Sequence, residues 1–175
     1  MMTLVVGGSA SGKSAWAEEL VLRSAARPRI YIATMEPYDD ECLRRIERHR
    51  QLRARKEFET VECYRDLEHL TVPAGGTVLL ECMGNLCANE LFRPGGSREA
   101  AREKILRGMD ALRRQCQNLI VVSNEVFSGG SRYGEGTLDY MKLLARVNRD
   151  LAARAEAVCE VVCGIPVYHK GGAPC

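Results

Sequence analysis

An eight-residue segment near the start of the chain places strict demands on the fold. It fits the pattern G-x-x-x-x-G-K-[ST], and it follows the short apolar run Thr3–Val6 and precedes helix-forming sequence. Glycines let the backbone curl so that successive N–H groups point at phosphate oxygens, and the new helix adds its positive N-terminal end. Because both flanks match, a nucleotide-binding loop is a better interpretation than a chance glycine-rich turn. Its residues are Gly7, Gly8, Ser9, Ala10, Ser11, Gly12, Lys13 and Ser14.

Two side chains of this phosphate loop are suited to chemistry. Lys13 can reach the β- and γ-phosphates of a nucleotide, and the Ser14 hydroxyl can hold Mg²⁺. Such a site also needs an acid at the end of another strand. Glu81, which follows an apolar run, is the first candidate, and Glu125 is the second, although either could be an ordinary strand-end acid. The sequence therefore predicts Lys13 as a catalytic residue and Ser14 with Glu81 as metal ligands.

Short, nearly all-apolar runs alternate with helical segments along the whole chain. This alternation is typical of a mainly parallel sheet with helices on both faces, here as one α/β domain over residues 1–175. The expected strands are Thr3–Val6, Arg29–Thr34, Thr60–Cys63, Thr77–Cys82, Asn118–Ser123, Ala157–Cys163 and Pro166–His169. The expected helices are Lys13–Ala26, one from Asp39 or Asp40 to about Lys56, one capped by Ser97 and ending near Gln117, and Thr137–Ala155.

Composition excludes several classes of protein. The formal net charge is only +2, so no global field is available to hold nucleic acid. The longest apolar runs are far too short to span a membrane, and the first residues do not resemble a signal peptide, so we expect a cytoplasmic protein. Eight cysteines contain no Cys-x-x-Cys pair, which favours reduced thiols, mostly buried, over a zinc site or disulfides.

A basic stripe lies on one of the expected helices. Arg45, His49 and Arg53 are spaced i, i+4, i+8, which puts all three on one helix face. Cationic side chains in a stripe repel one another unless something anionic, such as a polyphosphate, neutralises them. A solvated surface is the usual explanation of such a run, but neutral imidazole is also a nucleophile toward phosphorus, which favours a functional role. His69 and His169 lack such neighbours, and we expect them on the surface.

The ordered set of motifs resembles the bifunctional adenosylcobinamide kinase / adenosylcobinamide-phosphate guanylyltransferase family. The resemblance extends from one end of the chain to the other, and it is more specific than the phosphate loop alone. Its segments are Gly7–Ser14, Tyr31-Ile32-Ala33-Thr34, Asp40-Glu41, Arg45-Ile46 with His49 and Arg53, Leu80-Glu81-Cys82 with Asn89, Val122-Ser123-Asn124-Glu125-Val126, and Val161-Val162-x-Gly164-Ile165-Pro166 with Lys170.

The resemblance implies a P-loop fold and two reactions. One phosphorylates a hydroxyl of adenosylcobinamide with ATP or GTP, and the other transfers GMP from GTP to the resulting phosphate. It implies a corrinoid small-molecule substrate and a homotrimer, and it agrees with the Mg²⁺ expected at Ser14 and with the absence of a nucleic-acid partner and of a membrane span expected from the composition. The histidine that carries GMP corresponds to His49. Thr34, Arg45, Arg53 and Glu81 join the phosphate loop as expected nucleotide-binding residues.

The chain departs from the family pattern in the half expected to hold the corrinoid. The stretch Phe127–Tyr133 replaces a Gly-Ile-Val-Pro segment, and the following helix keeps only Asn148 of several typical polar residues. Three hypotheses follow: the bifunctional enzyme, a monofunctional small-molecule kinase or nucleotidyltransferase with a diverged acceptor, and a non-catalytic nucleotide-binding module. The glycine-rich loop from Phe127 to Gly136 is either a lid over a bulky substrate or a tolerated surface segment.

Overall fold

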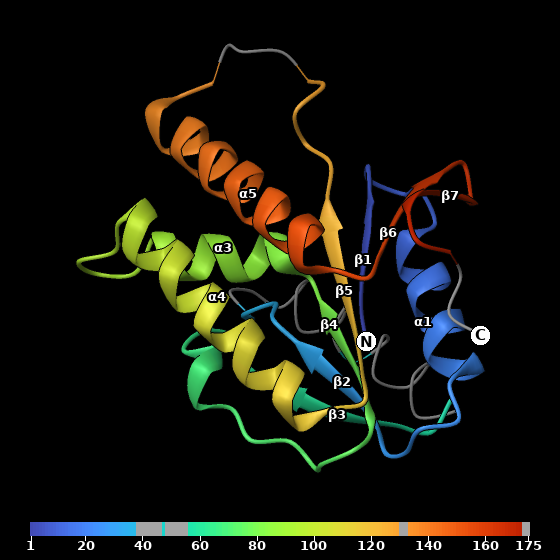
Figure 1. Ribbon diagram of the computed structural model, residues 1–175. Coiled ribbons are helices and arrows are strands. Elements are labelled where there is room, and N and C mark those ends of the chain that lie inside the picture. The colour runs from blue at the N-terminus through green and yellow to red at the C-terminus, as the bar shows by residue number, and fades with distance from the viewer. Residues whose placement is uncertain (38–46, 48–55, 130–132, 173–175) are drawn as a thin grey trace.

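One seven-stranded sheet forms the centre of the molecule (Figure 1). The structure is a computed structural model that describes residues 1–37, 47, 56–129 and 133–172. The strand order is β3-β2-β4-β5-β1-β6-β7, and every neighbouring pair is parallel except β6 and β7. The strands are β1 Met2–Gly7, β2 Arg29–Ala33, β3 Phe58–Glu62, β4 Thr77–Glu81, β5 Asn118–Asn124, β6 Ala157–Val162 and β7 Ile165–Lys170.

Helices cover both faces of this sheet, as the alternating sequence predicts. In Figure 1, α1 lies on one face, and α3, α4 and α5 lie on the other. The predicted α/β class with a mainly parallel sheet is therefore confirmed. The helices are α1 Lys13–Arg23, α3 Met83–Leu91, α4 Arg98–Gln115 and α5 Glu135–Arg154, with a short 3₁₀ helix at Leu67–His69.

The central strands are buried on both sides. Their consecutive side chains point to opposite faces of the sheet, and helices cover both faces. Leu4 of β1 and Val121 of β5 pack in the core beneath α3, α4 and α5. Their neighbours in sequence, Val5 and Val122, pack beneath α1. This double burial explains why the strands appear in the sequence as continuous apolar runs, and it holds the carboxyl ends of β1, β4 and β5 in a fixed relation.

Helix α3 was not expected from the sequence. Most of its residues are buried, so it lacks the polar face that gives an amphipathic helix its period. It also begins directly after β4, with Cys82 as an N-cap residue whose side chain makes no capping hydrogen bond. The helix brings Asn89 and Glu90 into the interior, where both are buried.

Several helix boundaries differ from those expected. α1 ends at Arg23 rather than Ala26, because Ser24 is extended and its hydroxyl accepts hydrogen bonds from the Ala26 amide and Asn118. α5 begins at Glu135, before the expected start. The cap at the start of α4 is confirmed, since the Ser97 hydroxyl accepts a hydrogen bond from the Ala100 amide at 3.2 Å.

The expected basic helix lies almost entirely outside the described residues, and Arg45, His49 and Arg53 all fall there. Within the described part, no helix is long and apolar enough to cross a membrane. The cysteines in that part are free thiols: Cys63, Cys87 and Cys159 are buried, Cys82 and Cys116 are partly buried, and Cys163 is exposed.

Candidate active site

The phosphate loop connects the carboxyl end of β1 to the N-terminus of α1. Gly12 is the N-cap of α1 with φ 93°, a left-handed conformation that favours glycine. Gly7 is needed for space, because a Cβ there would lie 2.5 Å from the Ser11 Oγ. The fold therefore places the loop's backbone at a helix N-terminus, the arrangement that binds phosphate.

Lys13 is held in place by the loop itself. Its Nζ donates a hydrogen bond to the Gly8 carbonyl oxygen at 3.0 Å. Among the residues that the structure describes, Lys13 forms no ion pair. A cation held by a neutral carbonyl keeps its attraction for an anion, so this lysine is available to a phosphate.

Glu81 meets the phosphate loop at the carboxyl end of β4. The Ser14 hydroxyl donates a hydrogen bond to Glu81 Oε1, and the Tyr31 hydroxyl donates one to Glu81 Oε2 at 3.0 Å. A carboxylate beside a serine hydroxyl is the kind of oxygen-donor set that Mg²⁺ takes together with phosphate oxygens and water. The pair fits the expected metal, and Ser14 and Glu81 would hold it.

Glu125, the other candidate acid, accepts hydrogen bonds from the loop that follows it. Its Oε1 accepts hydrogen bonds from the Phe127 amide at 2.8 Å and the Ser128 hydroxyl at 3.2 Å. Its backbone amide donates to the Gly7 carbonyl, so it lies near the phosphate loop without pairing with Ser14. The geometry therefore favours Glu81 over Glu125 as the magnesium-side acid.

Thr34, which follows β2, forms hydrogen bonds with Cys82, which follows β4. It is fully buried, and its hydroxyl both donates to the Cys82 carbonyl and accepts from the Cys82 amide, each at 2.8 Å. Two hydrogen bonds to one residue orient the backbone next to Glu81. The structure thus gives Thr34 a positioning role, and its direct contact with a nucleotide stays a prediction.

At the carboxyl end of β5, Asn124 packs against Gly84 of α3 and Tyr140 of α5. A Cβ at Gly84 would lie 2.8 Å from Asn124 Nδ2 and 2.9 Å from the Tyr140 hydroxyl oxygen, so these three residues are in close contact. Burial raises the pKa of Tyr140 to about 12, which keeps the phenol protonated. Asn148, the polar residue that matches the family pattern, accepts a hydrogen bond from the Ser123 hydroxyl at 2.6 Å.

Residues on both sides of the stretch that contains His49 form ion pairs with neighbouring elements. On one side, Arg65 Nη2 and Glu36 Oε2 are 2.6 Å apart. On the other side, Lys56 forms an ion pair with Glu18 of α1. Asn89 Nδ2 donates to the carbonyls of Thr34 and Tyr64, both at 2.9 Å.

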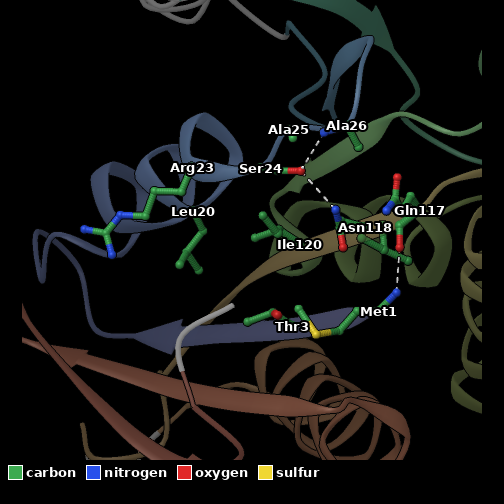
Figure 2. Close-up of a pocket in the computed structure, with 11 residues that line it drawn as sticks. Met1, Thr3, Leu20, Arg23, Ser24, Ala25, Ala26, Gln117, Asn118 and Ile120 are labelled. Carbon is green, nitrogen blue, oxygen red and sulfur yellow. Dashed lines mark hydrogen bonds between the residues drawn. The ribbon is translucent and has the colours of Figure 1, made fainter. Parts of the chain in front are cut away.

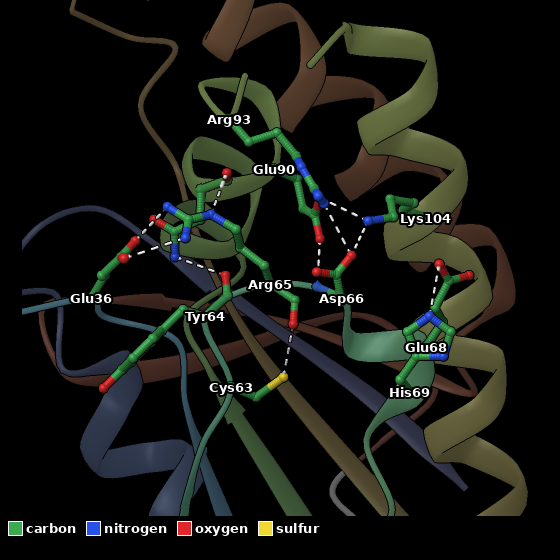
Figure 3. Close-up of polar contacts among 11 residues, drawn as sticks. Glu36, Cys63, Tyr64, Arg65, Asp66, Glu68, His69, Glu90, Arg93 and Lys104 are labelled. Atoms are coloured by element: carbon green, nitrogen blue, oxygen red, sulfur yellow. Dashed lines mark hydrogen bonds and ion pairs between the residues drawn. The ribbon is translucent and has the colours of Figure 1, made fainter. Parts of the chain in front are cut away.

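A second polar cluster lies beside α3 and contacts α4 (Figure 3). Arg93 Nη1 lies 3.0 Å from Asp66 Oδ1 and 3.1 Å from Glu90 Oε2, and Lys104 forms an ion pair with Asp66. The hydrogen bond from Lys104, helped by the neighbouring Arg93, holds the pKa of Asp66 below its usual value. These acids and bases neutralise one another, which indicates a structural role.

A cavity of about 340 Å³ lies at the opposite edge of the sheet from the phosphate loop (Figure 2). It is bounded by the amino ends of β1 and β5 and the end of α1. Its polar groups form hydrogen bonds with one another: the Met1 amino group donates to the Gln117 carbonyl at 2.6 Å, and the Asn118 side chain donates to the Ser24 hydroxyl. We assign it no part in the chemistry. The other histidines, His69 and His169, are exposed as expected.

Sequence reasoning did not single out Tyr31 or Arg65 by themselves, nor the contact of Asn89 with two backbone carbonyls. All three act through partners that are distant in sequence, such as Tyr31 with Glu81. The aromatic residue at the end of an apolar strand was the available signal for Tyr31, but it gives no partner.

Comparison with known proteins agrees with this geometry. The family model for "Cobinamide kinase / cobinamide phosphate guanyltransferase" matches residues 3–168. The chain belongs to this family. Its members include bifunctional adenosylcobalamin biosynthesis proteins: CobU of Escherichia coli (strain K12) is 36% identical, and the match covers 97% of this chain and all of CobU.

Further relatives support the same placement in the cobinamide kinase / guanyltransferase family. CobU of Salmonella typhimurium is 35% identical over 97% of this chain and 100% of its own length, and CobP of Pseudomonas aeruginosa is 32% identical over 98% of both chains. Among solved structures, the flagellar accessory protein FlaH of Methanocaldococcus jannaschii superposes with a TM-score of 0.54 at 10% identity, covering 98% of this chain and 78% of FlaH. That likeness concerns the fold alone.

Proposed function

We propose that this protein phosphorylates adenosylcobinamide and transfers GMP from GTP to adenosylcobinamide phosphate. The observation that carries the proposal is the contact of Ser14 with Glu81 beside Lys13, in a chain that belongs to the family over nearly its whole length. An intact phosphate loop with its acid supports catalysis over a purely nucleotide-binding role.

In the phosphoryl transfer, the hydroxyl oxygen of the acceptor forms a bond to the γ-phosphorus. The bond from that phosphorus to the β,γ-bridging oxygen breaks, the hydroxyl proton passes to water, and a nucleoside diphosphate leaves. Lys13 neutralises charge on the β- and γ-phosphates, and the loop amides bind their oxygens. Ser14 and Glu81 would hold Mg²⁺, which when bound neutralises the charge that develops on these phosphates.

In the GMP transfer, a ring nitrogen of His49 forms a bond to the α-phosphorus of GTP. The bond to the α,β-bridging oxygen breaks, and pyrophosphate leaves. An oxygen of adenosylcobinamide phosphate then attacks the same phosphorus, and the phosphorus–nitrogen bond breaks. Arg45 and Arg53, on the predicted stripe with His49, would balance the charge of the leaving pyrophosphate.

We place the corrinoid acceptor near the glycine-rich loop that precedes α5. Phe127 and Tyr133 in this loop are both 39% exposed, and Phe92, at the end of α3, is 61% exposed. A Cβ at Gly136 would lie 3.7 Å from Phe92, so the start of α5 brings these segments together. Exposed aromatic side chains suit a large, partly apolar ligand such as a corrin ring. Arg132, also expected to contribute, lies outside the described residues.

Three further properties complete the proposal. We expect a homotrimer, as the family resemblance implies, and no nucleic-acid partner, because the net charge is only +2. We also expect a cytoplasmic location, because the substrates are nucleoside triphosphates. Sedimentation of the purified protein checks the assembly.

Incubation with labelled GTP and Mg²⁺, followed by intact mass measurement, tests the proposed reactions. We expect one GMP per chain on wild type, bound through an acid-labile, base-stable linkage, and no label on His49→Ala. Adenosylcobinamide phosphate should discharge the label. Equal labelling of His49→Ala and wild type would show that the nucleophile is a different residue.

A further inference from the structure

Two polar side chains from different elements meet at the start of α3. Asn124 is the last residue of β5, and Tyr140 lies in the second turn of α5. Both pack against Gly84, where a Cβ would lie 2.8 Å from Asn124 Nδ2 and 2.9 Å from the Tyr140 hydroxyl oxygen. A residue without a side chain leaves room for both groups, so Gly84 allows an amide and a phenol to lie next to each other.

Neither group has a strong hydrogen-bond partner among the residues that the structure describes. Asn124 Nδ2 lies 4.0 Å from the Cys82 sulfur, which is a weak acceptor. The Tyr140 hydroxyl forms no hydrogen bond within that part of the chain, and it stays protonated because burial raises the pKa of Tyr140 to about 12. Polar groups that folding removes from bulk water are usually paired, so two adjacent unpaired donors indicate a ligand with acceptor oxygens.

The sheet places Asn124 between the phosphate loop and the acid of the expected metal site. β5 lies between β1 and β4. On one side, Asn124 pairs in register with Gly7, the first residue of the phosphate loop. On the other side, Val122, two residues earlier in β5, pairs with Glu81 at the end of β4. A group bound by the Asn124 amide therefore lies beside the place where the nucleotide phosphates bind.

The same two residues flank the glycine-rich loop beside which we place the corrinoid. Asn124 is at the end of the strand before this loop, and Tyr140 is in the helix that follows it. Phe92 lies near Gly136 at the start of that helix, and Tyr140 is one turn further along, in contact with Gly84. The two donors therefore lie between the proposed position of the corrin ring and the phosphate loop, where the reacting end of the acceptor must be.

The chemistry of these groups favours a phosphate over a hydroxyl as the ligand. The Asn124 N–H and the Tyr140 O–H are donors, and the N-terminal end of α3, whose N-cap side chain forms no capping hydrogen bond, also attracts negative charge. A hydroxyl that is about to be phosphorylated must give up its proton and needs an acceptor. A phosphate ester presents strong acceptor oxygens, which match the two donors.

We propose that Asn124 and Tyr140 form a subsite for the phosphate group of adenosylcobinamide phosphate. They donate hydrogen bonds to the oxygens of the phosphoryl group as it moves to the acceptor, and they hold the phosphate of the product afterwards. The bonds that form and break are those of the phosphoryl transfer described above, and neither residue gains or loses a proton. This inference rests on the proposed function, and it explains how the phosphate ester is distinguished from the unphosphorylated alcohol.

Equilibrium dialysis compares the two forms of the acceptor directly. Saturating ADP with EDTA occupies the phosphate loop and prevents transfer, and the absorbance of the corrinoid reports the bound fraction. Tyr140→Phe removes one donor and keeps the ring, so the Kd for adenosylcobinamide phosphate should rise roughly tenfold, as for loss of a hydrogen bond to a charged group. The Kd for adenosylcobinamide should stay within about twofold of wild type, because the alcohol carries no phosphate.

A second variant and a control accompany this measurement. Asn124→Asp keeps the shape of the side chain and replaces a donor with a negative charge, so it should weaken binding of adenosylcobinamide phosphate more than Tyr140→Phe does. It should change the binding of adenosylcobinamide little. Tyr64→Phe is the matched control, since the Tyr64 hydroxyl donates to Glu62 at 2.6 Å, and it should change neither Kd. Thermal melting checks that each variant is folded.

The kinetics of adenosylcobinamide phosphorylation give an independent readout. Donors that bind the moving phosphoryl group act in the transition state, so Tyr140→Phe should lower kcat roughly tenfold or more. The KM for adenosylcobinamide should stay within about twofold of wild type, whereas a general disturbance of the acceptor site would raise it.

The outcomes separate this inference from the proposed function. If wild type phosphorylates adenosylcobinamide and Tyr140→Phe changes both Kd values equally, or changes neither, the subsite is wrong and the function stands. If wild type does not phosphorylate adenosylcobinamide, the proposed function fails, and a selective loss of affinity for the phosphate ester in Tyr140→Phe still shows where that ester binds. Wild type that binds neither form of the acceptor overturns both.

Discussion

Two polar clusters near the carboxyl edge of the sheet differ in whether their charged groups are paired with opposite charges. Beside α3, Asp66 and Glu90 contact Arg93 and Lys104, so each acid has a basic partner. At the phosphate loop, Glu81 contacts only hydroxyl groups and Lys13 only a carbonyl in the described hydrogen bonds and ion pairs. Charged groups that contact only neutral groups within the protein keep their charge available to bind a ligand. The comparison therefore separates a structural cluster from a catalytic one without reference to any relative.

The largest effect should come from removing the unpaired cation. Lys13→Ala should lower both the phosphorylation of adenosylcobinamide and the GMP transfer by about 10²-fold or more, because both reactions use the same loop and lose a preorganised charge. Steady-state rates and nucleotide affinity measure the effect. Lys170→Ala is the control, since the hydrogen bonds of Lys170 to described residues go to two carbonyls at the end of α5, away from the phosphate loop. Unchanged turnover in Lys13→Ala would mean that the unpaired charge is not a functional signature.

A smaller effect should come from the hydroxyl that orients the unpaired acid. Tyr31→Phe removes the 3.0 Å hydrogen bond to Glu81 Oε2 and keeps the buried ring. A hydrogen bond to a charged group is worth about 1.5–3 kcal/mol, so we expect roughly a tenfold loss of kinase kcat/KM or more.

The Mg²⁺ dependence distinguishes positioning from simple loss of stability. If Tyr31 orients Glu81, the Mg²⁺ concentration needed for half-maximal activity should rise in Tyr31→Phe, and Ser24→Ala, a change in a hydroxyl at the far edge of the sheet, should leave it unchanged. An unchanged Mg²⁺ requirement would show that Tyr31 only packs.

Local sequence patterns were enough to predict the phosphate loop, its strand and helix, and the position of every strand to within two residues. For β1, β2, β4 and β5 they succeeded because these strands are buried on both faces, and each is therefore a separate apolar run. Glu81 was also predicted as a metal ligand, and its contact with Ser14 is the geometry that such a role needs.

Contacts between distant segments could not be predicted in the same way. Tyr31 reaches Glu81 only because β2 lies next to β4, and strand order does not follow from the pattern of any one strand. Helix α3 was missed because a nearly buried helix has no polar period. The role of His49 depends on the resemblance and on chemistry, and it stays a prediction.

The smallest effect should come from the paired cluster, and it should be an effect on stability rather than on catalysis. The pKa of Asp66 is lowered, so its carboxylate stabilises the folded state above its ordinary value of 3.8, and that contribution is lost as the pH falls through the folded pKa. Lys104→Met removes the main cause of the shift. Because Asp66 is partly exposed, solvent screens the pair, and we expect a loss of about 1 kcal/mol or less at pH 7.

Urea unfolding at pH 7 and at about pH 2.5 measures this difference, with Lys142→Met, an exposed lysine on α5, as the control. The deficit of Lys104→Met relative to wild type should shrink at the lower pH, because the Asp66 carboxylate loses its charge as the pH falls through its lowered pKa, and the control should show no such trend. Both reactions should keep the wild-type kcat at pH 7, because this cluster has its charges paired within the protein. A loss of kcat comparable with that of Lys13→Ala would show that paired charge does not mark a purely structural cluster, and the contrast between the two clusters would fail.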